Sequence, residues 1–152
     1  MLPQVDASVE GGSMAFTFRL PVRYGSIDFA RIVYYPQFLH FCHVAMEEMF
    51  AAVVGVTYPD ALQKERVGYP TVKSEADFIQ PVAYGEELLM SVAIARMGTS
   101  SVDFVYEGRR SSDGELAFRV RNVQVAVDMD AWESTPIPEH HRKAFETLTP
   151  EA

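Results

Sequence analysis

Apolar and polar residues alternate near the start of the chain, as they do in a half-buried β-strand. The apolar side chains that share one face of this stretch are Phe16, Phe18, Leu20 and Val22. Proline has no N–H to donate to a ladder, so Pro21 should lie at a sheet edge or end the strand. We therefore expect a first strand over residues 16–22.

The next apolar pattern is typical of a helix. Residues 24–35 read as a loop, and Pro36 then stands in the first turn of a helix, where proline is tolerated. From Gln37 to Val54 there is no further Gly or Pro, and apolar residues cover most of the circumference, which indicates a buried helix. A second, short helix is expected around Asp60 to Arg66.

Apolar and polar residues alternate again in the rest of the chain, in segments separated by turn-forming sequences. We expect strands at 72–78, 88–97, 102–110 and 116–127, and a polar C-terminal helix over 139–148. Consecutive strands joined by short turns usually pair as an antiparallel meander. The prediction is an α+β fold, a single domain over residues 14–152 with a five-stranded antiparallel sheet wrapped around the long helix. Residues 1–13 are expected to form a flexible N-terminal extension.

Composition narrows the function. Of 152 residues, 48% are hydrophobic and 22% are charged, an ordinary balance for one globular domain. The net charge of -8 argues against nucleic-acid binding, which usually needs a basic face. No apolar run reaches the roughly 18 residues of a membrane span, and no secretory signal is visible. With Cys42 as its one cysteine, the chain can form no internal disulfide. We expect a cytoplasmic protein that binds no membrane.

The segment 22–50 carries the most specific pattern. It contains Tyr24-Gly25, two further residues, Asp28, and then Ile32-Val33-Tyr34-Tyr35-Pro36 at the start of the long helix. This pattern resembles the entry to the central helix in the 4-hydroxybenzoyl-CoA thioesterase-like family of hotdog proteins, and the resemblance extends over roughly residues 16–138. It implies a single hotdog domain that hydrolyses a small acyl-CoA, whose acyl group could be aromatic.

The residues of this segment also suit such chemistry on physical grounds. Thioester hydrolysis needs a base or nucleophile at the carbonyl carbon and hydrogen-bond donors for the developing oxyanion. Asp28 can supply the first, and the N-terminus of the helix can supply the second, because its first N–H groups have no internal partner. Pro36 has no N–H, and the resemblance assigns the donor to the backbone amide of Tyr35. Alternatively, Asp28 caps the helix or pairs with Arg23 or Arg31.

Further side chains are candidate substrate contacts. Those at the helix entry are Tyr34, Pro36 and Phe38. Arg31 stands where the family often has Gly or another small residue, and this cation could meet the CoA phosphates or point into solvent. Arg109 and Arg110 could hold the same phosphates, because guanidinium binds phosphate in a bidentate manner. They could equally belong to a solvated turn.

His40 and His43 lie inside the predicted helix, on neighbouring faces. A metal site would need a third ligand, and no nearby motif offers one. We therefore predict no metal and no cofactor, with coenzyme A present only as part of the substrate. His43 corresponds to a family position that is often acidic or polar, so it could support the site. The alternative is a hydrogen-bonded core histidine.

Two other functions stay open. A hotdog dehydratase acting on acyl-CoA or acyl-carrier-protein would need a histidine at the site entrance, whereas the histidines here lie in the helix or in the C-terminal tail, as His140 and His141 do. A non-catalytic acyl-binding module would not need Asp28. The resemblance further implies a homodimer or homotetramer with active sites at the subunit interface, where residues between Val56 and Pro70 of a second subunit help to close each pocket.

Overall fold

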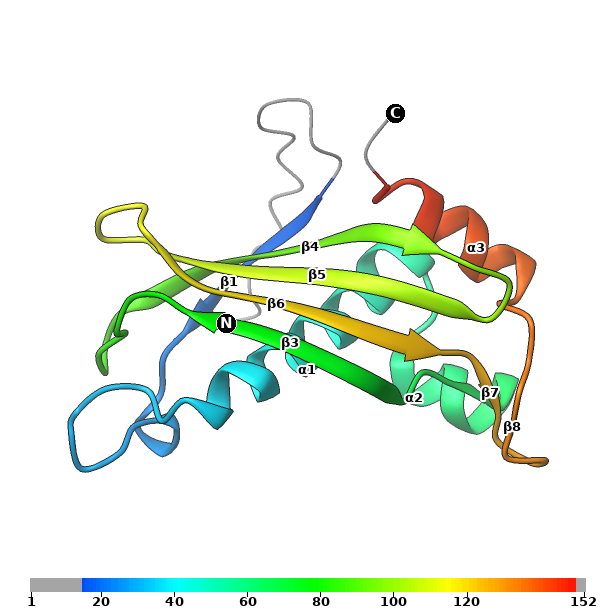
Figure 1. Cartoon of the computed structure of the whole chain (residues 1–152), viewed down its shortest axis with the longest axis horizontal. Helices are drawn as coiled ribbons and strands as arrows, with labels where there is room; N and C mark the ends of the chain where they lie inside the picture. Colours follow the sequence, from blue (N-terminus) through cyan, green and yellow to red (C-terminus); the bar gives the residue numbers. More distant parts are fainter. Residues whose placement is uncertain (1–14, 150–152) are drawn as a thin grey trace.

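A five-stranded antiparallel sheet forms the body of the molecule. The computed structural model describes residues 15–149, so the extension expected at residues 1–13 lies outside the described residues. The strands are β1 (Phe16–Pro21), β3 (Thr71–Phe78), β4 (Glu87–Met97), β5 (Ser101–Arg110) and β6 (Leu116–Val125). The sheet curves around helix α1 (Pro36–Met49), which lies along one of its faces (Figure 1). The predicted α+β hotdog architecture is confirmed.

Helix α1 begins at Pro36 as expected and presents an apolar face to the sheet. Its buried side chains are Phe38, Phe41, Cys42, Ala45, Met46 and Met49. The helix continues as one π-helical turn, η2 (Phe50–Val54), and ends at Gly55. Gly55 has φ 79°, a left-handed conformation that glycine adopts without steric cost. The long buried helix predicted to end near Val54 is therefore present.

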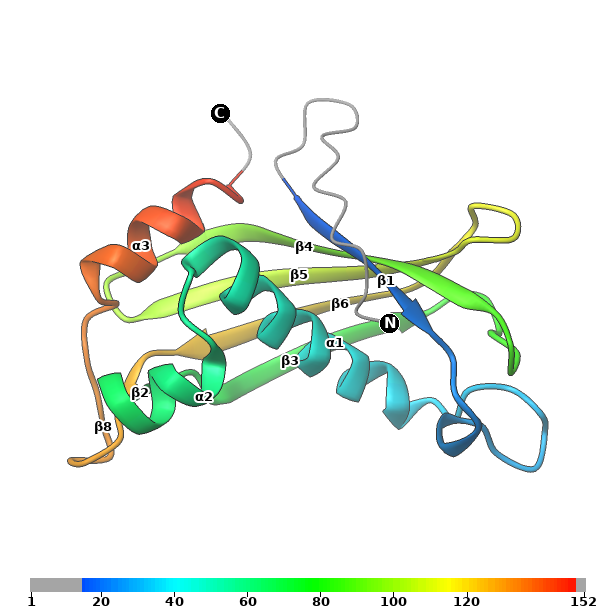
Figure 2. The ribbon, with the colours of Figure 1, turned by 180° about the vertical axis from the view of Figure 1, so that it is seen from behind.

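Smaller elements gather at the end of the sheet where α1 terminates. α2 (Tyr58–Asp60) and η3 (Ala61–Glu65) form the expected second helix, and α3 (Glu139–Glu146) the expected C-terminal one. A second sheet contains β2 (Val67–Gly68), β7 (Val127–Asp128) and β8 (Glu133–Ser134). Figure 2 shows α3 and these elements at one end of α1, and the loop that leads into α1, which includes the short 3-10 helix η1 (Tyr24–Ser26), at the other.

The core lies between α1 and the sheet face that it covers. Alternate residues of β4 have no exposed surface: Leu88, Met90, Val92 and Ile94. Phe16 and Phe18 of β1 are buried beside them, as their alternation predicts. Burial of each such large apolar side chain stabilises the fold by about 1.5–3 kcal/mol. This core holds α1 in a defined position relative to the sheet.

The predicted meander is wrong for one strand. The sheet order is β1-β4-β5-β6-β3, so β3 pairs with β6 and not with β4. The reason lies in residues 79–86, which pass the end of the β5–β6 hairpin. Ile79 and Gln80 donate backbone hydrogen bonds to the carbonyl of Ala117 in β6, and beyond the crossing Ser111 donates to the carbonyl of Glu87. The chain thus crosses two strands before it enters β4.

The crossing makes β3 an edge strand. All eight of its residues are exposed, although their alternating sequence suggests one buried face. Phe78 and Val72 are 46% and 63% exposed. An open edge with apolar side chains is a surface on which another strand can pair.

In the described part of the chain, no single helix is long and apolar enough to span a membrane. The stretches Pro36–Val54 and Tyr58–Glu65 reach that length and apolarity only together, and they are bent by 84° at the break between them.

Gly108 of β5 lies under the ring of Phe118 of β6, and an added Cβ would lie 2.2 Å from the Cε1 atom of that ring. We predict that Gly108→Ala lowers the free energy of unfolding by about 1–3 kcal/mol, because the ring must move within a packed core. Chemical denaturation measures this change. Gly25→Ala is the control, since an added Cβ there meets nothing within 4 Å. Equal free energies of unfolding for both variants would contradict the close packing of Phe118 against Gly108.

Candidate active site

A small hairpin precedes α1. Ile27 and Val33 form an antiparallel bridge, and the N–H of Asp28 donates to the carbonyl of Ile32 at 3.0 Å. The N–H of Arg31 donates to the carbonyl of Asp28, also at 3.0 Å, which closes a turn at the tip. Asp28 is therefore held by backbone hydrogen bonds on both sides.

The carboxylate of Asp28 is exposed and only partly engaged. Its Oδ1 accepts a hydrogen bond from the N–H of Ala30 at 2.8 Å, which is an Asx-turn within the hairpin. Its Oδ2 has no hydrogen-bond partner among residues 15–149, and no ion pair joins Asp28 to Arg23 or Arg31 there. The helix cap and the arginine pair considered as alternatives are thus not the arrangement of this side chain.

Arg31 occupies a backbone position that suits glycine. Its φ is 69°, in the left-handed region that residues with a Cβ rarely adopt. The resemblance places Gly or another small residue here, and this backbone conformation gives the physical reason. Arg31 also lines a hollow of about 560 Å³ together with Tyr24, Ile27, Asp28 and Phe29. The structure therefore brings Arg31 and Asp28 to the same hollow.

The start of α1 leaves one backbone donor free. Tyr35 is the N-cap residue, and no side chain in the described part of the chain caps this end of the helix. Gln37 donates to the carbonyl of Tyr34 at 2.8 Å, and Phe38 donates to that of Tyr35 at 3.1 Å. Within the described residues, the N–H of Tyr35 has no acceptor. The amide that was expected to polarise the substrate carbonyl is thus unpaired at a helix N-terminus.

Aromatic rings extend from the start of α1 to the open edge of the sheet. Tyr34 and Tyr35 have ring centroids 5.4 Å apart, and Tyr35 lies 5.6 Å from Phe78 of β3. Phe38 lies 5.8 Å from Phe78 and 4.6 Å from Phe118. Phe38 is buried, whereas Tyr34, Tyr35 and Phe78 are about half exposed. We call Tyr34, Tyr35, Phe38 and Phe78 the aromatic row.

Sequence reasoning missed Phe78, although it named the other three members of the aromatic row. The alternation in β3 does place Phe78 on the same strand face as Ala76. Only the pairing of β3 with β6 brings Phe78 to Phe38, and that pairing has no local signal. Phe29, which lines the hollow beside Asp28, was also missed because an aromatic residue in a loop has no characteristic spacing; Tyr24, which lines the same hollow, was noted in the sequence pattern but not named as a substrate contact.

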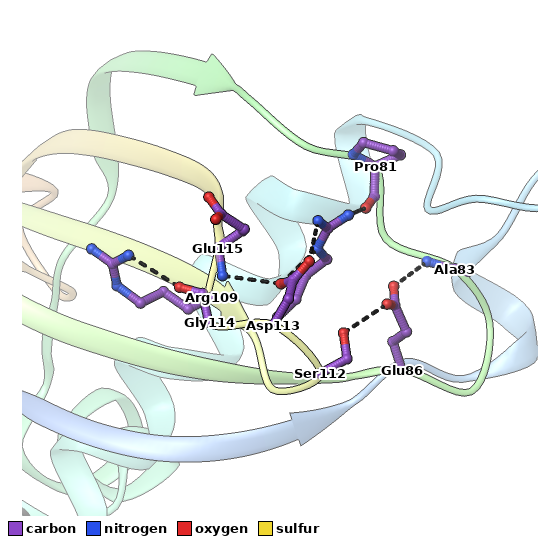
Figure 3. Close-up of polar contacts among 9 residues, drawn as sticks. Pro81, Ala83, Glu86, Arg109, Ser112, Asp113, Gly114 and Glu115 are labelled. Carbon is purple, nitrogen blue, oxygen red and sulfur yellow. Dashed lines mark hydrogen bonds and ion pairs between the residues drawn. The ribbon is translucent and has the colours of Figure 1, made fainter.

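Arg109 and Arg110 are the last two residues of β5, at the β5–β6 hairpin. Figure 3 shows Arg109 beside Gly114 of this hairpin. The Nε of Arg110 donates to Asp113 at 3.1 Å, and its Nη1 donates to the carbonyl of Pro81 at 3.0 Å. This hydrogen bond from Arg110 lowers the pKa of the Asp113 carboxyl below its ordinary value. Arg109 is exposed and donates to the carbonyl of Gly114 at 3.4 Å. Binding of CoA phosphates by this pair stays a prediction. The guanidinium of Arg110 already donates hydrogen bonds to Asp113 within the hairpin and to the carbonyl of Pro81.

The contacts of this hairpin reach the segment that supports the site. Figure 3 shows Glu86, whose carboxylate accepts from the N–H of Ala83 at 2.7 Å and from the hydroxyl of Ser112 at 3.2 Å. The neighbouring carbonyl of Val82 accepts from the N–H of Val33 at 2.8 Å. Arg110, through its hydrogen bond to Pro81, therefore helps to position the loop over residues 79–86. The Ile27–Val33 hairpin that carries Asp28 is bonded to this loop.

His43 lies away from Asp28. It is exposed on α1, where its Nε2 is 3.2 Å from Oε1 of Glu47 and its ring packs against Tyr58. Seven residues along a helix place it about 10 Å beyond Pro36. A supporting role for His43 stays a prediction. Pro36 itself is half-buried in the first turn of α1.

This arrangement can be compared with known proteins. Residues 22–145 match the model of the thioesterase-like superfamily, which is most of the chain. The chain belongs to the thioesterase-like superfamily. The membership agrees with the resemblance found in the sequence.

Relatives in this superfamily share both sequence and fold with the chain. A 1,4-dihydroxy-2-naphthoyl-CoA hydrolase from Nostoc punctiforme is 32% identical over 94 residues, which are 62% of this chain and 63% of that protein. A hydrolase of the same name from Synechocystis is 24% identical over 130 residues, covering 86% of this chain and 94% of the relative. The chain thus spans less than two thirds of the Nostoc protein and nearly all of the Synechocystis one.

Solved structures agree with the fold. A thioesterase superfamily protein from Jannaschia sp. matches with a TM-score of 0.83 and 28% identity, over 90% of this chain and 94% of that one. A 1,4-dihydroxy-2-naphthoyl-CoA thioesterase from Synechocystis matches with a TM-score of 0.80 and 24% identity, over 88% and 97%. The hotdog arrangement of the superfamily therefore extends over nearly the whole described chain.

The backbone conformation of Arg31 leads to a stability prediction. Arg31→Gly should raise the free energy of unfolding by up to about 1 kcal/mol, because glycine adopts φ 69° without the steric cost that a Cβ brings. Arg23→Gly is the matched control: Arg23 has φ -103°, so glycine there adds only unfolded-state entropy and lowers stability. Urea denaturation of both variants tests this. A loss of similar size in both would contradict the left-handed conformation of Arg31.

Proposed function

We propose that this chain is an acyl-CoA thioesterase that hydrolyses the thioester of a small aromatic acyl-CoA. One observation carries the proposal: within residues 15–149, Asp28 has a carboxylate oxygen without a partner and Tyr35 has a backbone N–H without an acceptor, and both belong to one short segment before α1. Membership of the thioesterase-like superfamily supports the reaction type. The names of the cyanobacterial relatives support an aromatic substrate.

The two groups supply what the reaction needs. The thioester oxygen accepts a hydrogen bond from the N–H of Tyr35, and the positive end of the α1 dipole stabilises the negative charge that develops on it. Asp28 then either removes a proton from the attacking water or attacks the carbonyl carbon itself. In both routes the carbon–sulfur bond breaks, the sulfur leaves with coenzyme A, and water supplies the oxygen of the acid product.

The aromatic row suggests where the acyl group lies. Tyr34, Tyr35 and Phe78 are exposed and offer ring faces and edges to an aromatic acyl group. Each aromatic pair contributes about 0.5–1.5 kcal/mol to binding beyond the contribution of the buried apolar area. A naphthoyl ring, such as the one in the substrate after which the relatives are named, would suit this surface. Arg31, which lines the hollow beside Asp28, is then available to the phosphates of CoA.

The open edge of β3 supports assembly with a second copy. An antiparallel pair of β3 strands would extend the sheet across two subunits and cover Val72 and Phe78. In such a pair the Thr71 end of one strand lies beside the Phe78 end of the other. Residues between Val56 and Pro70 of the second subunit would then approach the aromatic row, so each site is completed across the interface. A homotetramer of two such dimers is the larger alternative.

The alternative functions have less support. A dehydratase needs a histidine at the site, whereas His43 and Glu47 contact each other on the outer surface of α1. A binding module has no need for an unpaired carboxylate at Asp28. A cytoplasmic location and the absence of a cofactor stay predictions.

Replacement of Asp28 tests the chemistry. Asp28→Asn should reduce kcat for the best substrate by roughly a hundredfold or more, because the amide is neither a base nor a nucleophile. Thiol release from 1,4-dihydroxy-2-naphthoyl-CoA, benzoyl-CoA and hexanoyl-CoA measures the rate and ranks aromatic against aliphatic acyl groups. No hydrolysis by the unmodified protein would remove the thioesterase assignment, and equal rates in both proteins would remove the role of Asp28.

Two control variants sharpen this experiment. Glu146→Gln makes the same acid-to-amide change in α3, at the opposite end of α1, and should leave kcat unchanged. Tyr35→Phe keeps the backbone amide and removes only the ring hydroxyl, so kcat should fall by less than about threefold. A loss as large as that of Asp28→Asn would mean that Tyr35 acts through its side chain.

The assembly has its own test. Val72→Glu puts a charge on the open edge of β3 and should raise the dimer dissociation constant by roughly tenfold or more, since each 1.4 kcal/mol lost is a factor of ten. Sedimentation equilibrium measures that constant. Leu89→Glu is the control, because Leu89 is exposed on β4 between Arg19 and Arg109, two strands away from the β3–β6 pair. A monomeric unmodified protein, or equal weakening in both variants, would contradict pairing through β3.

A further inference from the structure

Three potential metal ligands converge at the end of the molecule opposite to Asp28. The Oε2 of Glu65 is 2.6 Å from Nε2 of His140, and its Oε1 is 2.8 Å from Nε2 of His141. One nitrogen or oxygen from each residue lies within 4.8 Å of those of the other two. The Nε2 atoms of two imidazoles thus face the two oxygens of one carboxylate.

The three residues come from elements that the core holds together. Glu65 is the last residue of η3, and the two histidines lie in the first turn of α3. α3 is fixed by Phe145, which has no exposed surface and lies 5.8 Å from Phe50 and 5.5 Å from Phe104, ring centroid to centroid. The two histidines are therefore presented to Glu65 by packing that does not depend on the polar contact.

One of the imidazoles is oriented by a further hydrogen bond. His141 is fully buried, and its Nδ1 lies 2.7 Å from the hydroxyl of buried Tyr69. A histidine that binds a metal through one ring nitrogen typically uses the other in such a contact, which fixes the ring and its tautomer. The side chains of His140 and Glu65 are 54% and 27% exposed, so this cluster is accessible from solvent.

We propose that Glu65, His140 and His141 bind a divalent transition-metal ion, with Zn²⁺ as the best match. Histidine nitrogen and carboxylate oxygen are ordinary zinc ligands, and water from the exposed side would complete a tetrahedral set. Ligand atoms around tetrahedral zinc are about 3.3 Å apart, given bonds of about 2.0 Å. The two contacts of Glu65 therefore need to lengthen by less than an ångström, which the exposed side chain of His140 permits.

The ion would connect η3 to α3 and so stabilise the fold. Its role is structural, because Figure 2 places α3 at the opposite end of α1 from the loop that contains Asp28. The sequence prediction of no metal site considered His40 and His43, and it could not detect ligands from two distant segments. The competing account is that Glu65 only accepts hydrogen bonds from the two imidazoles, and the experiment distinguishes the two.

The test is metal binding by the full-length chain without an affinity tag. Titration with Co²⁺ should give the visible absorption of a four-coordinate ion, saturating at one ion per chain, and Zn²⁺ should displace it. Zn²⁺ should also raise the Tm. Glu65→Gln and His140→Ala should each weaken binding by roughly tenfold or more, as expected when a ligand is removed. The circular dichroism spectra of both variants are first compared with that of the unmodified chain, to confirm that the variants are folded.

Matched controls keep the result interpretable. His40→Ala and His43→Ala remove exposed histidines from α1 and should leave binding unchanged. Glu65→Gln retains an oxygen that accepts a hydrogen bond, so α3 can stay docked while a ligand charge is lost. No saturable binding by the unmodified chain, or an affinity in Glu65→Gln and His140→Ala equal to that of the unmodified chain, would overturn the proposal. Because these readouts do not involve thioester hydrolysis, they are independent of the proposed activity.

Discussion

The burial of one face of α1 against the sheet is the interaction on which the site depends. Phe41, Met46 and Met49 are at most 4% exposed, and side chains of this size each stabilise the fold by about 1.5–3 kcal/mol when buried. This packing determines where the helix begins. The hydrogen bond from Val33 to the carbonyl of Val82 then attaches the preceding hairpin to the loop before β4. The position of the Asp28 hairpin follows from these contacts.

The elements of the fold could be predicted from the sequence because their signals are local. The alternation of Phe16 and Phe18, and Pro36 at the start of an uninterrupted apolar stretch, report on neighbours a few residues away. The placement of β3 could not be predicted in this way. It depends on the path of residues 79–86, and the hydrogen bonds that direct this path to Ala117 involve residues far apart in the chain.

The same distinction applies to functional residues. Asp28 and Tyr35 are separated by seven positions in a recognisable pattern, so the sequence identified both as candidates, and their roles stay predictions. Phe78 joins the aromatic row only through the β3–β6 pairing. For Arg110 the residue type suggested phosphate binding, which stays a prediction, and the sequence did not show that its donors contact Asp113 and the carbonyl of Pro81. A residue type indicates which chemistry is available, and the folded neighbours decide how it is used.

The two ends of the helix that begins at Pro36 differ in how their backbone groups are hydrogen-bonded. At its C-terminal end the N–H of Gly55 donates to the carbonyl of Phe50, and the chain leaves the helix without strain. At the other end no side chain among the described residues caps the helix, and the absence of a cap typically costs about 1 kcal/mol. The packing of α1 offsets that cost several times over. An unpaired amide can therefore persist at Tyr35 because the stability of the helix comes from its buried face rather than from its termini.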